Sequence, residues 1–229
     1  MAIIKKYPAR VVNILNKIEG VYTLELESLS KPFKYEPGQF LHLAIDEYDP
    51  SGQWPESRCF SLQSAPANEL IKITYAVKGR FTKRMATELM PGSLVTLKLP
   101  YGDLFTQDHC KEDTVFIAGG TGITPFLSLF TDTVFEGYKK PVLFAGFQNK
   151  SLNLYHNELV VAKQFNPDFM INCIYQDEKG ILDIEKILQK SNRKSSFFIS
   201  GPPAMIKNFK NYLINQEISE NQIKTDDWE

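Results

Sequence analysis

The sequence predicts a two-domain protein, with a six-stranded antiparallel barrel followed by an α/β domain around a parallel sheet. Two rhythms support this: the first half holds six short β-rich runs, and the second alternates apolar runs with helical patterns. The polar stretch DLFTQDHCKED lies between the two patterns. We therefore expect domains at residues 1–108 and 109–229.

The first half consists of strands separated by turn residues. LIKITYAV alternates apolar and polar residues, as a half-buried strand does. Turn pairs such as Glu19-Gly20, Pro37-Gly38 and Pro91-Gly92 separate the runs. One helix is expected at TKRMATEL. Six strands with one helix are typical of a small antiparallel barrel. The six runs are ARVVNIL, VYTLELES, QFLHLAI, CFSLQSA, LIKITYAV and SLVTLKL.

The second half repeats a strand–helix unit four times. Apolar runs of strand length each precede a stretch with helical spacing, which is the βαβ pattern of a parallel sheet covered on both faces. The expected pairs are TVFIAG with TPFLSLFTDTVFEG, VLFAGF with NLYHNELVVAKQF, FMINCIY with DIEKILQK, and SSFFIS with PAMIKNFKNYLINQ.

Composition argues against several classes of function. The net charge is −1, so no basic field suggests a nucleic-acid partner. No apolar run reaches the roughly 20 residues that span a bilayer, and the N-terminal stretch MAIIKKYPARVVNIL does not resemble a signal peptide. We expect a cytoplasmic protein without membrane insertion. Cys59, Cys110 and Cys173 are widely spaced, which predicts no disulfide, metal site or iron–sulfur cluster within the chain.

Two glycine-containing turns follow predicted strands of the second half. AGGTGITPFLSLF (118–130) follows TVFI, so Gly119, Gly120 and Gly122 permit a tight turn, with a helix starting between Ile123 and Pro125. A helix start offers free N–H groups to a phosphate. SGPPAM follows SSFFI, and ligands of such sheets bind at the carboxyl ends of strands. Each turn alone also fits a tight connection that binds no ligand.

The barrel half contains a cluster of residues suited to a flat, phosphorylated ligand. In RCFSLQSAP, Arg58 and Phe60 share one strand face while Ser61 points the other way. Arg58 can pair with a phosphate and Phe60 can lie against a ring. In VKGRFTKRMATEL, we expect Thr82 to be the N-cap of the helix. A barrel strand with a surface arginine, followed by an ordinary capped helix, is the alternative.

Six segments in order resemble the ferredoxin–NADP reductase superfamily of flavoproteins. They cover nearly the whole chain. EPGQFLHL, RCFS, VKGRFT and LPYGDLF resemble the flavin-domain motifs, and AGGTGITP and SGPPAM resemble the two pyridine-nucleotide segments. The resemblance implies a flavin-binding barrel followed by a Rossmann-like nicotinamide-nucleotide domain.

The resemblance also implies cofactors and residue roles. FAD, or less often FMN, would bind without a covalent bond, and NADPH or NADH would be the electron donor. Arg58 and Thr82 would hold the flavin phosphates, Phe60 would stack near the ring system, and Ser61 would reach N5. Ser61 and Ser200 are the predicted catalytic residues. The predicted cofactor-binding set is Arg58, Cys59, Phe60, Ser61, Tyr75, Val77, Lys78, Gly79, Arg80, Phe81, Thr82, Gly120, Thr121, Gly122, Thr124, Gly201, Pro202, Met205 and Trp228.

The sequence departs from the family pattern in three places. Phe60 stands where the flavin motif usually has tyrosine, so stacking survives but a phenolic hydrogen bond is lost. Ser200 stands where cysteine often precedes G-P-P, near the hydride path. The chain ends IKTDDWE, where Asp226 and Trp228 take the place of the acid and aromatic of family members; a frayed terminus is the alternative.

The sequence therefore predicts an NAD(P)H-dependent, FAD-containing reductase. Because the chain lacks the cysteines of a fused ferredoxin domain, the acceptor would be a separate ferredoxin, flavodoxin or oxygenase component, or a small molecule such as free flavin. The alternative is a nucleotide-binding electron-transfer or regulatory subunit with no turnover of its own. No acidic residue follows VLFAGF, and Lys150 slightly favours NADP over NAD as the bound nucleotide. A solvated loop lysine is the alternative for Lys150.

Overall fold

The computed structural model describes residues 3–226, which form two compact units that divide between Asp103 and Leu104. The expected boundary lay slightly later, between residues 108 and 109. Leu104 belongs to the second unit because its side chain is buried in that unit's core. The ring of Phe105 packs there too, with its centroid 5.0 Å from that of Phe198.

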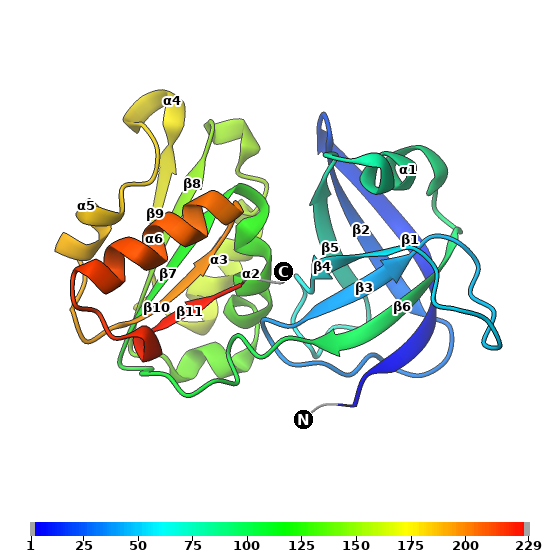
Figure 1. Cartoon of the computed structure of the whole chain (residues 1–229), viewed down its shortest axis with the longest axis horizontal. Coiled ribbons are helices and arrows are strands. Elements are labelled where there is room, and N and C mark those ends of the chain that lie inside the picture. The colour runs from blue at the N-terminus through cyan, green and yellow to red at the C-terminus, as the bar shows by residue number, and fades with distance from the viewer. Residues whose placement is uncertain (1–2, 227–229) are drawn as a thin grey trace. The chain divides into compact units, whose positions relative to one another are not determined.

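The first unit is a strongly curved, six-stranded antiparallel sheet with one helix (Figure 1). The strand order is β4-β3-β6-β1-β2-β5. The edges approach beyond the strands, where the Gln63 amide donates to the Lys72 carbonyl at 2.9 Å. The predicted barrel is therefore confirmed as a near-barrel. The elements are β1 (Lys5–Ile18), β2 (Val21–Ser28), β3 (Phe40–Ala44), β4 (Ser57–Ser61), β5 (Ile71–Ala76), α1 (Arg80–Glu88) and β6 (Leu94–Tyr101).

Alternation along the strands builds the core of this unit. On β5, Ile71, Ile73 and Tyr75 are buried in one cluster, as the LIKITYAV pattern predicts. Helix α1 adds Phe81 and Met85 to the same cluster. The core therefore fixes both β5 and the start of α1.

The second unit is a five-stranded parallel sheet of order β11-β10-β7-β8-β9, with helices on both faces (Figure 1). One hydrophobic cluster joins the sheet to α2 and α3, and a second joins it to α5 and α6. The elements are β7 (Asp113–Gly119), η1 (Gly120–Ile123), α2 (Thr124–Phe130), η2 (Thr133–Gly137), β8 (Lys140–Phe147), η3 (Lys150–Leu152), α3 (His156–Phe165), β9 (Met170–Tyr175), α4 (Gln176–Lys179), α5 (Ile184–Gln189), β10 (Ser196–Ser200), α6 (Pro203–Asn215), η4 (Glu220–Gln222) and β11 (Ile223–Thr225).

Two features of this unit differ from the predicted pattern. The helix predicted over TPFLSLFTDTVFEG ends at Phe130, because the Asp132 carboxylate caps a separate short helix by accepting from the Val134 amide at 2.9 Å. Strand β11 has no counterpart in the prediction. It pairs in parallel with β10, and only Ile223 of its three residues is buried.

An ion-pair network in the first unit links α1 to the chain after β3. The Arg84 guanidinium bonds Asp46 at 2.6 and 3.1 Å and Glu88 at 2.8 and 3.0 Å. Hydrogen bonding from Arg84 lowers the pKa of both carboxyl groups. A lowered folded-state pKa contributes stability that is present above the unfolded value and is lost as pH falls through the folded one.

We predict that Asp46→Asn flattens the acid limb of the stability profile. The wild-type free energy of unfolding should fall more steeply than that of the variant as the pH drops below 3.8, the ordinary pKa of Asp46. Urea unfolding of both proteins at neutral pH and at several acidic pH values measures this difference. Parallel profiles would show that the ion pair adds nothing measurable.

Candidate functional site

The first unit brings four predicted side chains to the seam between β4 and β5. The rings of Phe60 and Tyr75 pack across it with centroids 5.9 Å apart. The Arg58 guanidinium lies over the Phe81 ring, 5.3 Å from its centroid. Phe60 keeps 8% exposure and Arg58 is exposed. The seam thus holds three packed rings, each at most 8% exposed, with a cation beside them.

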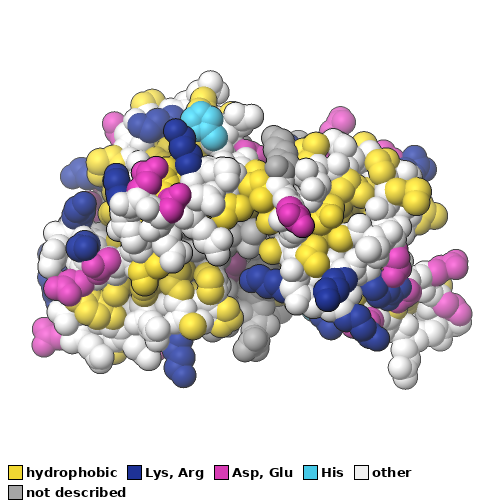
Figure 2. Space-filling model, turned by 90° about the horizontal axis from the view of Figure 1, so that it is seen from above, with side chains coloured by type: hydrophobic (Ala, Val, Ile, Leu, Met, Phe, Trp, Pro, Cys, Tyr) yellow, Lys and Arg dark blue, Asp and Glu magenta, His cyan; other side chains and the backbone are white. Residues whose placement is uncertain are grey.

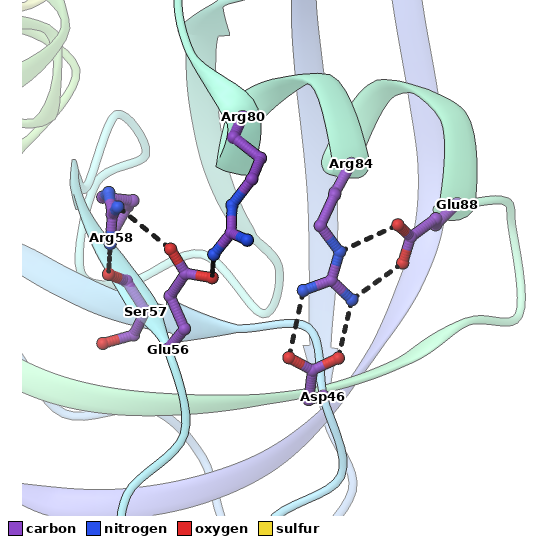
Figure 3. Close-up of polar contacts among 7 residues, drawn as sticks. All are labelled: Asp46, Glu56, Ser57, Arg58, Arg80, Arg84 and Glu88. Carbon is purple, nitrogen blue, oxygen red and sulfur yellow. Dashed lines mark hydrogen bonds and ion pairs between the residues drawn. The ribbon is translucent and has the colours of Figure 1, made fainter.

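Glu56, which is not among the predicted site residues, bridges two arginines at this seam (Figure 3). Glu56 bonds Arg58 at 3.1 Å and Arg80 at 2.9 Å. Arg58 also donates to the Ser57 carbonyl at 2.8 Å. The Glu56 side chain is 29% exposed, against 53% for Arg58 and 81% for Arg80. In the sequence, Glu56 reads as one more polar loop residue, and no motif distinguishes it.

The start of α1 corrects the expected role of Thr82. Gly79 is the N-cap, and Thr82 is the third residue of the helix. The Thr82 hydroxyl reaches back to accept from the amides of Lys78 at 3.0 Å and Gly79 at 3.1 Å. Thr82 therefore organises the VKGRFT turn from inside the helix, which leaves the extended Gly79 at the cap.

Strand alternation separates Cys59 and Ser61 from the aromatic seam. Cys59 lies beside His42 on the other face of the sheet, with its sulfur 3.5 Å from Nε2. Burial raises the pKa of the Cys59 thiol, so the thiol stays protonated at neutral pH. Ser61 is buried opposite Phe40 of β3. Val77 packs against the core, and its amide donates to the Gly20 carbonyl at 2.8 Å.

Tyr75 has a buried hydroxyl without a hydrogen-bond partner among the described residues. The side chain is 4% exposed, and its ring stacks on Tyr22 at 5.5 Å. Burial, with a smaller effect of Tyr22, raises the pKa of Tyr75, so the phenol remains a donor. An unmet buried hydroxyl costs about 1–3 kcal/mol, and an acceptor on a bound ligand would remove that cost.

In the second unit, the two predicted turns pack directly against one another. They follow the adjacent parallel strands β7 and β10. A Cβ placed on Gly122 would lie 2.5 Å from the Gly201 Cα and 2.7 Å from the Ser200 carbonyl carbon. A Cβ on Gly119 would lie 2.9 Å from both Pro202 Cδ and Met205 Sδ. Glycine is required here for close approach of two backbones.

The remaining predicted residues of the first turn are ordered by local hydrogen bonds. Gly120 has φ +56°, a conformation that glycine adopts without strain. The Thr124 hydroxyl donates to the Thr121 carbonyl at 2.9 Å and closes the turn into α2. The helix start thus lies where the sequence predicts it.

At the carboxyl end of β10, Ser200 meets the C-terminal segment. The Ser200 hydroxyl bonds the Asp226 carboxylate at 3.1 Å, and the Asp226 amide donates to the Ile199 carbonyl at 3.0 Å. Strand β11 delivers Asp226 to this position. Trp228 lies outside the described residues.

Charges of both signs are interspersed over the face drawn in Figure 2, without a field of one sign. Within residues 3–226, no three His, Cys, Asp or Glu side chains form a group that could hold a metal ion. In that same range, no helix is long and apolar enough to cross a membrane.

The chain is similar to several reductases and to electron-transfer proteins. Residues 116–211 match the family model of the oxidoreductase NAD-binding domain. The chain is 29% identical to the phenol 2-monooxygenase reductase component of Pseudomonas sp. (strain CF600), covering 65% of this chain and 40% of that protein. It is 34% identical to a probable dihydroorotate dehydrogenase B (NAD(+)) electron transfer subunit of Methanopyrus kandleri, covering 56% and 45%.

The fold is similar across both units to that of a solved structure. A ferredoxin NADP+ reductase from Neisseria gonorrhoeae with bound FAD and NADP matches with a TM-score of 0.80 and 17% identity, covering 97% of this chain and 98% of that one. By contrast, the chain spans about half the length of the curated relatives it matches.

We predict that Gly122→Ala destabilises the second unit by about 1–3 kcal/mol, since one backbone must shift to admit the methyl group. Gly137→Ala is the matched control, because a Cβ there meets nothing within 4 Å. Thermal unfolding of the two variants makes the comparison. Equal melting temperatures would contradict the close packing of the two turns.

Proposed function

We propose that the chain is a ferredoxin reductase-like FAD/NAD-binding module that takes hydride from NADPH or NADH onto bound FAD and passes the electrons to a separate acceptor. The observation that carries this proposal is the seam of the first unit. There Arg58, Phe60, Tyr75 and Phe81 combine packed aromatic rings, a buried donor and a cation. A flat ring system attached to a phosphate matches that combination.

The residues of the seam fit a flavin nucleotide. In this proposal Phe60 and Tyr75 cover the ring system, and the orphaned Tyr75 hydroxyl finds an acceptor on the cofactor. Arg58 and Arg80 hold its phosphates, together with the amides of the turn that Thr82 organises. Tyr75 would thus restore a phenolic hydrogen bond that Phe60, in the usual tyrosine position, cannot make.

The second unit is proposed to hold the nicotinamide nucleotide. The packed turns at Gly122 and Gly201 let backbone groups approach a ligand closely, as required at the carboxyl ends of parallel strands. Gly120, Thr121 and Thr124 line the first turn, and Pro202 and Met205 the second. The Lys150 side chain is exposed after β8, so its position does not decide between NADPH and NADH. We propose both nucleotides as donors, and the test below separates them.

Hydride transfer needs little acid–base catalysis by the protein. When bound, flavin supplies the chemistry of accepting two electrons as a hydride and releasing them singly or in pairs. Binding and orientation are the main work of the chain, because alignment supplies the proximity advantage. In the first unit, the Ser61 hydroxyl is proposed to lie near the flavin ring. In the second unit, the Ser200 hydroxyl is proposed to lie near the nicotinamide ring, with Asp226 orienting it through the 3.1 Å bond.

We propose a separate redox protein as the acceptor, in particular an oxygenase component. The similarity to a phenol 2-monooxygenase reductase component supports this choice. A ferredoxin, a flavodoxin or free flavin is the remaining set of candidates. The similarity to the probable electron transfer subunit of Methanopyrus kandleri favours a second function, that of an electron-transfer subunit that does not turn over alone.

An absorption spectrum of the purified protein, followed by anaerobic addition of NADH or NADPH, tests the proposal. The reductase should show the two visible bands of oxidised flavin, and one nucleotide should bleach them. Extraction and mass analysis of the cofactor separate FAD from FMN. A protein that stays colourless after incubation with FAD would reject the flavin site. A coloured protein that neither nucleotide bleaches would favour the electron-transfer subunit.

Tyr75→Phe should change the stability of the flavin-free protein and its FAD affinity in opposite directions. Removing an unsatisfied hydroxyl should raise the stability of the flavin-free protein, by about 1 kcal/mol, and should weaken FAD binding about three- to tenfold. Chemical unfolding and flavin fluorescence titration measure the two effects. Tyr22→Phe, on the half-buried ring stacked against Tyr75, is the control and should change FAD affinity little. Unchanged FAD affinity in Tyr75→Phe would remove Tyr75 from the cofactor contacts.

A further inference from the structure

We propose that Glu56 is a displaceable internal anion that occupies the phosphate position of the flavin site and lowers the affinity of that site for phosphorylated flavins. This inference rests on the proposed function, because it concerns the same site. The Glu56 carboxylate uses one oxygen for Arg58 and the other for Arg80, as a phosphate would (Figure 3). The two arginines come from different elements, β4 and α1.

Comparison with Arg84 explains why an incoming anion would bind at Arg58 and Arg80. Arg84 lies on the same helix but bonds two carboxylates, Asp46 and Glu88, through three of its nitrogens. That group of one arginine and two acids carries a net negative charge. Arg58 and Arg80 share one carboxylate, Glu56, so this group of two arginines and one acid carries a net positive charge. The positive charge around α1 that no carboxylate neutralises therefore lies beside Glu56.

The solvent exposure of the three side chains permits an incoming phosphate to replace the Glu56 carboxylate. Arg80 is 81% exposed and Arg58 is 53% exposed, so an anion can reach both guanidinium groups from solvent. Arg58 has two further contacts, with the Ser57 carbonyl and the Phe81 ring, which hold it in place when the carboxylate leaves. Among the described residues, Glu56 is the one carboxylate within ion-pair distance of Arg80.

Exposed ion pairs contribute little stability, so breaking both of them costs little. The exchange therefore weakens binding of a flavin phosphate without blocking it. Its effect should shrink with salt, which screens exposed charges. Riboflavin has no phosphate and should not compete with Glu56.

The test is fluorescence titration of the full-length, flavin-free protein with FAD and with riboflavin. Glu56→Gln should bind FAD about three- to tenfold more tightly at low ionic strength, with riboflavin affinity unchanged. The gain should shrink at high salt. Glu88→Gln removes a carboxylate from the same helix and is the matched control, with FAD affinity unchanged. Arg80→Gln should weaken FAD binding and largely abolish the gain from Glu56→Gln.

Calorimetric titration with inorganic pyrophosphate separates failure of this inference from failure of the proposed function. Flavin binding by the wild type with equal or weaker FAD affinity in Glu56→Gln would overturn the inference and leave the reductase proposal intact. A gain of similar size for riboflavin would also overturn it. Tighter pyrophosphate binding by Glu56→Gln, with no flavin bound by any variant, would keep the anion site and reject the flavin.

Discussion

The close approach of Gly122 and Gly201 is the constraint on which the second unit's candidate site depends. An added Cβ at Gly122 would lie within 2.7 Å of backbone atoms of the neighbouring turn, so two parallel strands can end side by side here only with glycine at this position. Both turns lie at the carboxyl ends of the adjacent strands β7 and β10, where ligands of such sheets bind. This packing also leaves Ser200 at the edge, where β11 brings Asp226 to its hydroxyl. Backbone packing, with few side chains, thus forms the end of the sheet at which we propose nucleotide binding.

In the first unit, the proposed flavin site would need both a flat apolar surface and a place for negative charge. Packing of Phe60 against Tyr75 would meet the first need, and the Tyr75 hydroxyl has no hydrogen-bond partner among the described residues. The unequal sharing of carboxylates among Arg58, Arg80 and Arg84 would meet the second. Core packing of Phe81 and Met85 holds α1 in place, so the charge arrangement depends on the apolar interior of the unit.

Sequence periodicity predicts the two sheets well, because burial of alternate residues such as Ile71, Ile73 and Tyr75 leaves a clear pattern. Strand β11 escapes prediction because it buries only Ile223 and depends on pairing with β10. The cap at Asp132 and the inward-reaching Thr82 are decided by side-chain geometry, which spacing alone does not encode. Leu104 joins the second core from within a polar stretch. Glu56 could not be predicted, since its role depends on which arginines surround it in space.

Transfer of hydride from nicotinamide to flavin is tested most directly by an isotope effect on rapid-mixing kinetics. The flavin-loaded protein would be mixed without oxygen with the preferred nucleotide, unlabelled or carrying deuterium at either face of nicotinamide C4. The account predicts loss of the oxidised-flavin absorbance, and a slower loss with deuterium on one face only, as expected when an aligned C–H bond breaks. Absorbance that persists with both nucleotides, at concentrations where they bind, would contradict it.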